Sequence, residues 1–344
     1  MTLEQAFRDQ SGTCARMGSP LMGRVMGLLA DHWDHASALG QAMAAYEGDI
    51  GPAGHSLPLR IGGGLHALAL QGLDPALVAA YPPNDVSDAA LTTAVLEALA
   101  RHEAFMLDWT QLPPQTNEVR RSAALIAMAQ VACARFDRPI ALSELGASGG
   151  LNLMWDHFAL EAGGARFGPA DAVLTLAPAW EGPVPPAGTP RVVDRAGVDL
   201  NPLDPRAPDD LLRLTAYLWA DQPERLARTR AAASVFDAAM TRGDAIDWLA
   251  QRLEQAPKGH MHLIQHTVAW QYFPAAAQAR GRALIEAAGA RATDETPLAW
   301  MQMETDGDIT GAVGAALTLR LWPGDITLDL GRADFHGRWI RWTG

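Results

Sequence analysis

Short apolar runs alternate with longer segments of helical periodicity from residue 139 onward, and this alternation restricts the fold more than any other feature. The runs at 139–145 ("PIALSEL"), 260–270 ("HMHLIQHTVAW") and 297–305 ("PLAWMQMET") are typical of buried strands. Strands separated by helices favour a largely parallel sheet. Two further runs, in residues 315–330, surround a Pro-Gly pair and predict a terminal antiparallel hairpin. The sequence therefore predicts an α/β fold with a Rossmann-like sheet of the seven-stranded methyltransferase type.

The secondary structure of four further segments can be predicted. Residues 149–160 ("GGLNLMWDHFAL") predict a helix directly after the first strand. Residues 172–180 and 190–200 predict two strands on either side of the Pro/Gly-rich turn "EGPVPPAGTP". Residues 275–289 predict a helix that ends at Gly289, because glycine is the usual residue after the last helical turn.

Residues 1–137 have a different character. The segment "SPLMGRVMGLLADHW" repeats apolar residues every three or four positions after the start signal Ser19-Pro20. Proline-rich clusters such as "YPPND" and "QLPPQ" separate further segments of the same kind, and none of them indicates a strand. The chain is therefore expected to contain a helical domain at 1–137, a candidate lid over the substrate, and an α/β domain at 138–344.

The stretch "ELGASGGLNL" at 144–153 fits two incompatible templates. Read as E-x-G-x-x-x-G, it is typical of the glycine loop that holds S-adenosylmethionine. Read as G-x-S-x-G, it is typical of a serine-hydrolase nucleophile elbow centred on Ser148. Glu144 at the end of a strand suits a cationic cofactor better than a pyrophosphate, and Leu151 breaks the dinucleotide pattern G-x-G-x-x-G. The hydrolase interpretation lacks strands before the elbow, so the cofactor interpretation is preferred.

Acidic residues further along the chain extend the predicted cofactor site. Asp199 in "GVDLNPLD" follows a predicted strand, where an acid can bind ribose hydroxyls. Asp244 in "RGDAIDWL" precedes a small residue and a helix, as does the acid beside adenine in methyltransferases. Structural alternatives are an Asx turn for Asp199 and a helix cap for Asp244. The predicted cofactor-binding residues are Glu144, Gly146, Ser148, Gly150, Asn152, Asp199 and Asp244.

Methyl transfer depends mainly on positioning, because the sulfonium is already activated, but a base helps an acceptor that must lose a proton. His266, towards the carboxyl end of a predicted central strand, is the candidate base, with a hydrogen-bonded core histidine as the alternative. Tyr272, in the loop that follows, is the second catalytic candidate. The stretch "QTNEVRR" is either a solvated helix start or a part of the lid that reaches the substrate. The predicted substrate-binding residues are Asn117, Glu118, Arg121 and Gln271.

Charge and composition exclude several classes of function. A net charge of −12 argues against general nucleic-acid binding, which needs a basic surface. Cys14 and Cys133 have no C-x-x-C partner, so neither a structural zinc site nor a disulfide framework is expected. The start "MTLEQAFRDQ" lacks the apolar core of a signal peptide, and no apolar run is long enough for a bilayer. We expect a cytoplasmic protein that acts on a small molecule, with no metal and no membrane partner.

Seven stretches spread over nearly the whole chain resemble a family of uncharacterised bacterial proteins, whose members are similar to Rossmann-like methyltransferases. The resemblance implies this fold more strongly than it implies a particular reaction. A non-catalytic or regulatory protein with a degenerate methyltransferase fold stays open as an alternative, because Ser148 replaces the middle glycine of the loop, and a serine hydrolase stays open as a second. The stretches are "GSPL" (18–21), "QTNEVRRS" (115–122), "ELGASGGLNLMWD" (144–156), "GVDLNPLDP" (197–205), "RGDAIDWL" (242–249), "HTVAWQYFP" (266–274) and "PLAWMQME" (297–304).

Overall fold

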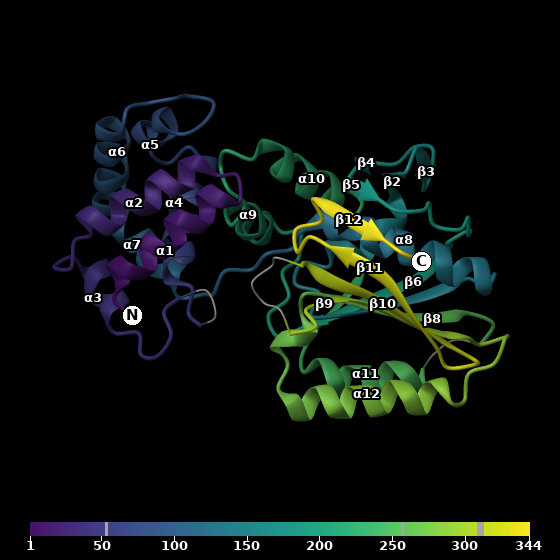
Figure 1. The fold of residues 1–344 in the computed structure, drawn as a ribbon. Helices are drawn as coiled ribbons and strands as arrows, with labels where there is room; N and C mark the ends of the chain where they lie inside the picture. Colours follow the sequence, from purple (N-terminus) through teal and green to yellow (C-terminus); the bar gives the residue numbers. More distant parts are fainter. Residues whose placement is uncertain (52–53, 256–257, 308–312) are drawn as a thin grey trace. The chain divides into compact units, whose positions relative to one another are not determined.

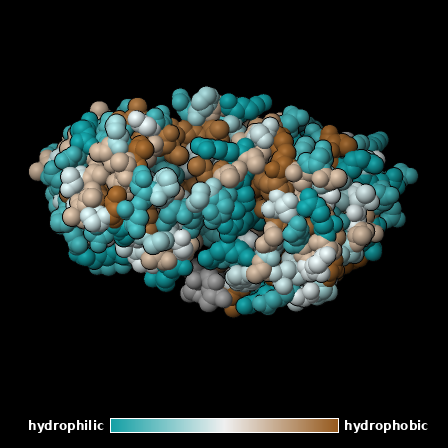
Figure 2. All heavy atoms as spheres, turned by 90° about the horizontal axis from the view of Figure 1, so that it is seen from above, coloured by the Kyte–Doolittle hydropathy of each residue, from teal (hydrophilic) through white to brown (hydrophobic). Residues whose placement is uncertain are grey.

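A computed structural model describes residues 1–51, 54–255, 258–307 and 313–344. The chain forms two compact units, each built from two segments. The first contains Met1–Thr116 and Ala207–Ala227, and the second contains Asn117–Arg206 and Arg228–Gly344. Among the described residues, no helix is long and apolar enough to cross a membrane. On the face shown in Figure 2, hydrophilic residues cover most of the surface and hydrophobic residues are interspersed among them.

The first unit is helical, and its centre is a helix that is buried along most of its length. This helix, α4, contains three consecutive glycines. A Cβ atom at Gly62 would lie 2.6 Å from Met26 Cε, and one at Gly63 would lie 2.4 Å from the Tyr217 ring. The glycines therefore let neighbouring side chains approach the α4 backbone. The helices are α1 (Leu3–Arg16), α2 (Pro20–His32), α3 (Ala38–Ala44), α4 (Leu57–Leu70), α5 (Pro75–Ala80), α6 (Asp88–Arg101), α7 (Glu103–Thr110) and α9 (Pro208–Ala216), and α10 (Pro223–Ser234) begins in this unit and ends in the other.

The segment after α9 is hydrogen-bonded to the start of α2 and to α4 in the same unit. Ser19 caps α2 by accepting a hydrogen bond from Met22 N, and its hydroxyl donates to Asp221 Oδ1 at 2.5 Å. Asp221 Oδ2 accepts a second bond from Leu21 N at 2.9 Å. His66 Nδ1 lies 2.7 Å from the carbonyl oxygen of Leu218. Through these contacts residues 207–227 pack with the N-terminal helices of their unit, although 90 residues separate them from residue 116 in the sequence.

The second unit is an α/β structure with a nine-stranded sheet and a separate three-stranded sheet. The large sheet has the order β5-β12-β11-β10-β9-β8-β1-β6-β7, and the small one has the order β3-β2-β4. The strands are β1 (Ile140–Leu145), β2 (Phe158–Ala162), β3 (Ala165–Phe167), β4 (Leu174–Leu176), β5 (Ala179–Glu181), β6 (Val192–Asp199), β7 (Ala239–Arg242), β8 (Met261–Thr267), β9 (Leu298–Glu304), β10 (Ala315–Trp322), β11 (Ile326–Ala333) and β12 (Trp339–Trp342).

Helices cover both faces of the large sheet. One face packs on α8, and the other packs on α11 and α12, which lie side by side along the sheet (Figure 1). Strands β7, β6, β1, β8 and β9 pair in parallel, whereas β9 to β12 form an antiparallel meander. Helical elements of this unit are η1 (Val119–Arg121), α8 (Ser122–Arg135), η2 (Leu151–His157), α11 (Ala245–Glu254), η3 (Trp270–Tyr272) and α12 (Ala275–Gly289).

The structure confirms an α/β chain with a mostly parallel sheet, helices at the N-terminus and a terminal antiparallel hairpin, but the sheet has nine strands and not seven. The additional strands arise at its β5 edge. The predicted strand 172–180 is interrupted before Pro178, which has no N–H to donate. Its first half, β4, pairs with β2 in the small sheet, and its second half, β5, pairs with β12.

One predicted helix is wrong, and another is confirmed. Residues 149–160 form only the short 3₁₀ element η2, and then β2 begins at Phe158. The reason lies in Gly163 and Gly164, which both have positive φ and form the turn of the β2–β3 hairpin. The helix predicted at 275–289 is confirmed, since α12 ends at Gly289, and a Cβ on this glycine would lie 2.5 Å from the Trp322 ring.

Candidate functional site

Three predicted acids follow three adjacent parallel strands. Glu144 is the penultimate residue of β1, Asp199 is the last residue of β6, and Asp244 comes two residues after β7. The register pairs Leu145 with Val198 and Asp199 with Arg242, so the three strands end at the same edge of the sheet. The structure therefore brings the acids to one edge, the carboxyl edge, where open α/β sheets bind their ligands.

Glu144 is the most unusual of these acids. Glu144 is 2% exposed, and its Oε2 atom is buried without a hydrogen-bond partner among the described residues. Burial raises the pKa of its carboxyl to about 8, although a hydrogen bond with Gln265 and the positive charge of Arg121 act in the opposite direction. A buried carboxyl with an unused oxygen costs stability unless a partner satisfies it. The feature points to a ligand that donates hydrogen bonds or carries positive charge.

The loop after β1 is held by its own unit. Gly146, Ser148 and Gly150 all have left-handed backbone angles, with φ of 67°, 54° and 68°. A Cβ on Gly146 would lie 2.6 Å from Ala269 Cβ, and one on Gly150 would lie 2.8 Å from Met240 Sδ. The glycines are therefore needed both for the turn and for close internal packing.

Asp199 and Asp244 both accept backbone hydrogen bonds. Asp199 Oδ2 accepts from Ser148 N at 2.9 Å, and its Oδ1 accepts from Asn201 N at 2.8 Å in an Asx turn. Asp244 is exposed and caps α11, since its Oδ1 accepts from the N–H groups of Ile246 and Asp247 at 2.9 Å each. Asp199 thus joins the end of β6 to the glycine loop, and Asp244 has a capping role that does not require a ligand.

Ser148 carries the hydrolase hypothesis. Its Oγ is buried and has no hydrogen-bond partner among the described residues. A nucleophilic serine needs a base within hydrogen-bond reach, and no histidine contacts this hydroxyl. The left-handed conformation resembles an elbow, but the proton acceptor that would activate the serine is missing from the described contacts.

Two asparagines lie under the loop. Asn117 Oδ1 accepts a hydrogen bond from Leu151 N at 2.8 Å, and Asn152 Oδ1 accepts one from the Ser122 hydroxyl at 2.7 Å. Both residues are buried. These bonds connect the segment before α8 with the residues that follow the glycine loop, so both side chains position the loop from within the unit.

His266, the predicted base, is fully buried in an aromatic cluster. Its Nδ1 lies 2.8 Å from Glu304 Oε1, and its Nε2 accepts a hydrogen bond from Trp300 Nε1 at 2.9 Å. The ring also stacks on Trp270 at a centroid distance of 5.0 Å. Because Nε2 accepts from an indole, the hydrogen of this neutral ring is on Nδ1 and points to Glu304. Both nitrogens are therefore occupied by partners.

Glu304 holds the loop that follows β8. Besides His266, its Oε1 accepts hydrogen bonds from Ala269 N at 2.9 Å and Trp270 N at 3.1 Å. Burial alone would raise the pKa of this carboxyl, but the bonds from His266 and the two backbone N–H groups outweigh burial and lower it. Glu304 was not among the residues predicted from the sequence. The sequence feature that could have identified it is an acidic residue at the end of the largely apolar run 297–304.

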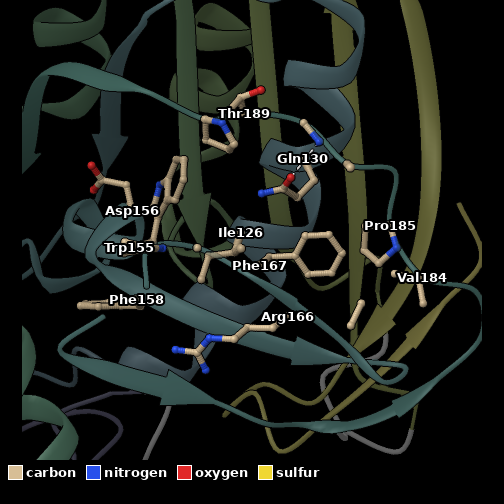
Figure 3. Close-up of a pocket in the computed structure, with 16 residues that line it drawn as sticks. Ile126, Gln130, Trp155, Asp156, Phe158, Arg166, Phe167, Val184, Pro185 and Thr189 are labelled. Atoms are coloured by element: carbon tan, nitrogen blue, oxygen red, sulfur yellow. Dashed lines mark hydrogen bonds between the residues drawn. The ribbon is translucent and has the colours of Figure 1, made fainter. Parts of the chain in front are cut away.

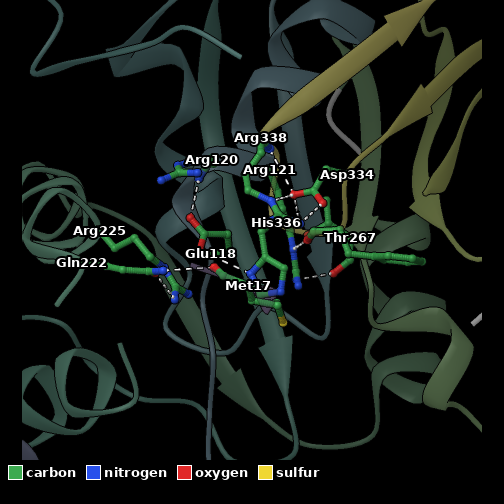
Figure 4. Close-up of polar contacts among 11 residues, drawn as sticks. Met17, Glu118, Arg120, Arg121, Gln222, Arg225, Thr267, Asp334, His336 and Arg338 are labelled. Carbon is green, nitrogen blue, oxygen red and sulfur yellow. Dashed lines mark hydrogen bonds and ion pairs between the residues drawn. The ribbon is translucent and has the colours of Figure 1, made fainter. Parts of the chain in front are cut away.

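The remaining predicted residues surround the ends of β8 and β11. Arg121 donates to the carbonyl oxygens of Thr267 and Phe335 at 3.2 and 2.8 Å. Glu118 accepts from Arg120 N through Oε1, and its Oε2 lies 3.8 Å from His336 Nδ1 (Figure 4). Gln271 and Tyr272 lie in η3: the side-chain oxygen of Gln271 accepts from Thr305 N, and Tyr272 is 72% exposed.

Gln265 is a second site residue that was not predicted from the sequence. It lies on β8 opposite Glu144 on β1, and its Oε1 accepts a hydrogen bond from Trp155 Nε1 at 3.0 Å. Its amide also donates to the carbonyl oxygen of Asn152 at 3.2 Å. The available signal was a polar residue within a buried apolar strand. Gln265 thereby connects Glu144 to the wall of a pocket.

This pocket has a volume of about 670 Å³ and lies between α8, the β2–β3 hairpin and the proline-rich segment 183–190 (Figure 3). Trp155, Phe158 and Phe167 supply aromatic walls. Asp156, also on the wall, forms a bidentate ion pair with Arg195, with N–O distances of 2.7 and 3.0 Å. The volume and the largely apolar lining of this pocket are typical of small-molecule sites.

No group of three or more His, Cys, Asp or Glu residues suitable for a metal ion occurs in the described parts of the chain. A comparison with curated proteins finds no match.

A family model, described as an uncharacterized protein conserved in bacteria (DUF2332), matches residues 4–342. Because this match covers almost the whole sequence, the chain belongs to the DUF2332 family of bacterial proteins.

Proposed function

We propose that the chain binds S-adenosylmethionine at the carboxyl edge of its large sheet and transfers the methyl group to a small molecule. The observation that carries the proposal is the buried Glu144 carboxyl with its unpartnered Oε2 beside the glycine loop. An ammonium or sulfonium group is the chemistry that such a carboxyl would bind best.

Strand order supports the location of the site. Numbered along the chain, the parallel strands β1, β6, β7, β8 and β9 have the spatial order 3-2-1-4-5. This is the order of the first five strands of doubly wound, Rossmann-like folds. The order reverses between β1 and β8, and ligands of such sheets bind at the carboxyl edge of that reversal. Glu144 on β1 and Gln265 on β8 lie opposite each other there.

Each residue of the site has a role within this proposal. Glu144 would bind the cationic end of the cofactor, and Asp199 and Asp244 would face the ribose and the adenine. When bound, the sulfonium supplies an activated methyl group. Tyr272 has an exposed hydroxyl after β8 and is the accessible catalytic candidate, whereas His266 orders that loop through Glu304. We assign Asn117, Glu118, Arg121 and Gln271 to substrate positioning.

Titration calorimetry with S-adenosylmethionine tests the proposal directly. Because the pKa of Glu144 is about 8 before binding, a cation beside it would lower that pKa and release protons near pH 7. Titrations in two buffers with different ionisation enthalpies measure this release. Glu144→Gln should abolish the release and weaken binding roughly tenfold or more, and Glu161→Gln, an exposed control on β2, should change neither. Gly146→Val is unsuitable, because its side chain would meet Ala269.

Three outcomes separate the alternatives. Absence of binding heat and of a thermal shift at millimolar S-adenosylmethionine and S-adenosylhomocysteine would contradict the proposal and favour a protein with a degenerate fold. Binding without turnover of any methyl acceptor would favour a regulatory role. Labelling by a fluorophosphonate that disappears in Ser148→Ala would favour a hydrolase instead.

A further inference from the structure

A second, polar pocket in the α/β unit has an unusual charge. It has a volume of about 300 Å³, and Arg120, Arg228 and Arg338 line it. Arg120 comes from η1, Arg228 comes from α10, and Arg338 directly precedes β12, so three distant segments converge on it. The described lining contains no carboxylate. In a chain with a net charge of −12, this grouping does not reflect a generally basic surface.

The acids near this pocket are already engaged in other bonds. Asp334 pairs with Arg338, with N–O distances of 2.7 and 2.9 Å, and also accepts from the backbone N–H of His336 (Figure 4). Glu118 accepts from the backbone N–H of Arg120. The guanidinium group of Arg120 forms no hydrogen bond or ion pair with the described residues. Arg338 is thus neutralised within the unit by Asp334, a carboxylate that does not line the pocket.

The backbone keeps two of these arginines together. Gly337 has a left-handed φ of 68°, and a Cβ there would lie 2.6 Å from the carbonyl oxygen of Arg120. The turn before β12 therefore packs directly on η1, with Arg338 and Arg120 on neighbouring walls. Thr175 adds a hydroxyl, which accepts a bond from Arg166 and so has its own hydrogen to donate.

We propose that this arginine pocket binds a small molecule through an oxyanion group, a phosphate or a carboxylate. Guanidinium groups pair with both in a bidentate geometry, and they stay charged at every physiological pH. The pocket volume admits the anionic group together with a small part of the molecule that carries it. The site is independent of the methyl-transfer proposal, since neither Glu144 nor the glycine loop lines it.

Calorimetric titration of the full-length chain with inorganic phosphate, at constant ionic strength in sodium chloride, tests this site. Arg120→Gln and Arg228→Gln should each weaken phosphate binding roughly tenfold or more, because each removes a charge-assisted hydrogen bond. Arg291→Gln, an exposed control two residues after α12, should leave the affinity unchanged. Arg120→Lys should give an intermediate affinity, because it keeps the charge and loses the bidentate geometry. Thermal unfolding in chloride alone checks that each variant folds.

A parallel titration with succinate distinguishes the two sources of the oxyanion. Tighter binding of phosphate identifies a phosphate site, and tighter binding of succinate identifies a carboxylate site. The proposal is overturned if neither anion binds more tightly than chloride, or if folded Arg120→Gln and Arg228→Gln bind as the parent chain does. Phosphate binding that persists in Asp199→Asn, a variant at the other site, shows that the two sites are separate.

Discussion

Glu144 combines burial, a free oxygen atom and a raised pKa in one side chain. Burial penalises the charged form and keeps the carboxyl protonated at neutral pH, and Oε2 has no hydrogen-bond partner among the described residues. A protonated acid beside a glycine loop is ready to lose its proton when a cation arrives. The same property has a consequence for stability that does not depend on any ligand.

The stability of the folded chain should fall with pH because of Glu144. Its pKa rises from 4.5 to about 8 on folding, so the folded state retains a proton that the unfolded state releases above pH 4.5. The sign is therefore a loss of stability between about pH 4.5 and 8, at up to ~1.4 kcal/mol per pH unit. Glu144→Gln removes this loss. The free energy of unfolding of this variant, relative to that of the parent chain, should therefore increase by about 3 kcal/mol at most from pH 5 to pH 7.

Denaturant unfolding of the parent chain and of Glu144→Gln at pH 5, 6, 7 and 8 measures the difference. Glu161→Gln, which replaces an exposed carboxyl, should run parallel to the parent chain. A stability difference between Glu144→Gln and the parent that is constant over this range would contradict the raised pKa.

At the residue scale, the sequence predicted which acids stand at strand ends but not what satisfies them. Glu144 and Asp199 lie at the ends of predicted strands, whereas Asp244 was predicted from its position before a small residue and a helix. Gln265 could not be assigned as the partner of Glu144, because that pairing depends on the register of two strands that are over 110 residues apart. The partners of His266 were equally hidden, since Trp300 and Glu304 come from the next strand.

At the element scale, local signals worked where burial and periodicity agreed. Strands β1, β8, β9 and the β10–β11 hairpin were predicted from their apolar patterns. The helix expected at 149–160 failed because tertiary pairing of β2 with β3 and β4 outweighs its helical periodicity. Strand β7 was missed, since only one of its four residues is even partly buried and its sequence carries little apolar signal.

Helix α12 offers a test of packing against propensity. A Cβ at Gly281 would lie 2.7 Å from both Ile246 Cδ1 and Trp270 Cη2, so Gly281→Ala should destabilise the chain by about 1–3 kcal/mol. Gly27, in the middle of α2, is the matched control, because its nearest neighbour would be 3.6 Å away. Gly27→Ala should stabilise the chain by roughly 0.5–1 kcal/mol through helix propensity. Thermal unfolding compares them, and stabilisation by both substitutions would show that α12 has room beside α11.

At the scale of the whole molecule, the chain crosses between its units three times. The sequence predicted a change of character near residue 138, but the inserted segment 207–227 has the same helical pattern as the helices around it. Its place in the first unit depends on contacts of Asp221 and His66 that only the folded chain forms. Periodicity does not record such long-range hydrogen bonds.

The two units should therefore respond separately to local damage. Asp221→Ala removes the acceptor of Ser19 Oγ and of Leu21 N, so it should weaken the first unit by about 1–3 kcal/mol. Hydrogen exchange with mass spectrometry should then show faster exchange in α1, α2 and α9, although α9 lies over 170 residues from α2. Exchange in β1, β8 and β9 should stay unchanged.

Leu263→Ala is the reciprocal variant, since it removes a fully buried side chain from β8 and should cost about 2–5 kcal/mol in the α/β unit. Faster exchange should then be confined to the sheet and to α8, α11 and α12. If either substitution instead accelerated exchange in both units to the same extent, the chain would unfold as one cooperative structure. Separate responses would mean that residues 207–227 fold with the N-terminal helices, so that a ligand bound at the carboxyl edge of the sheet would protect the α/β unit alone.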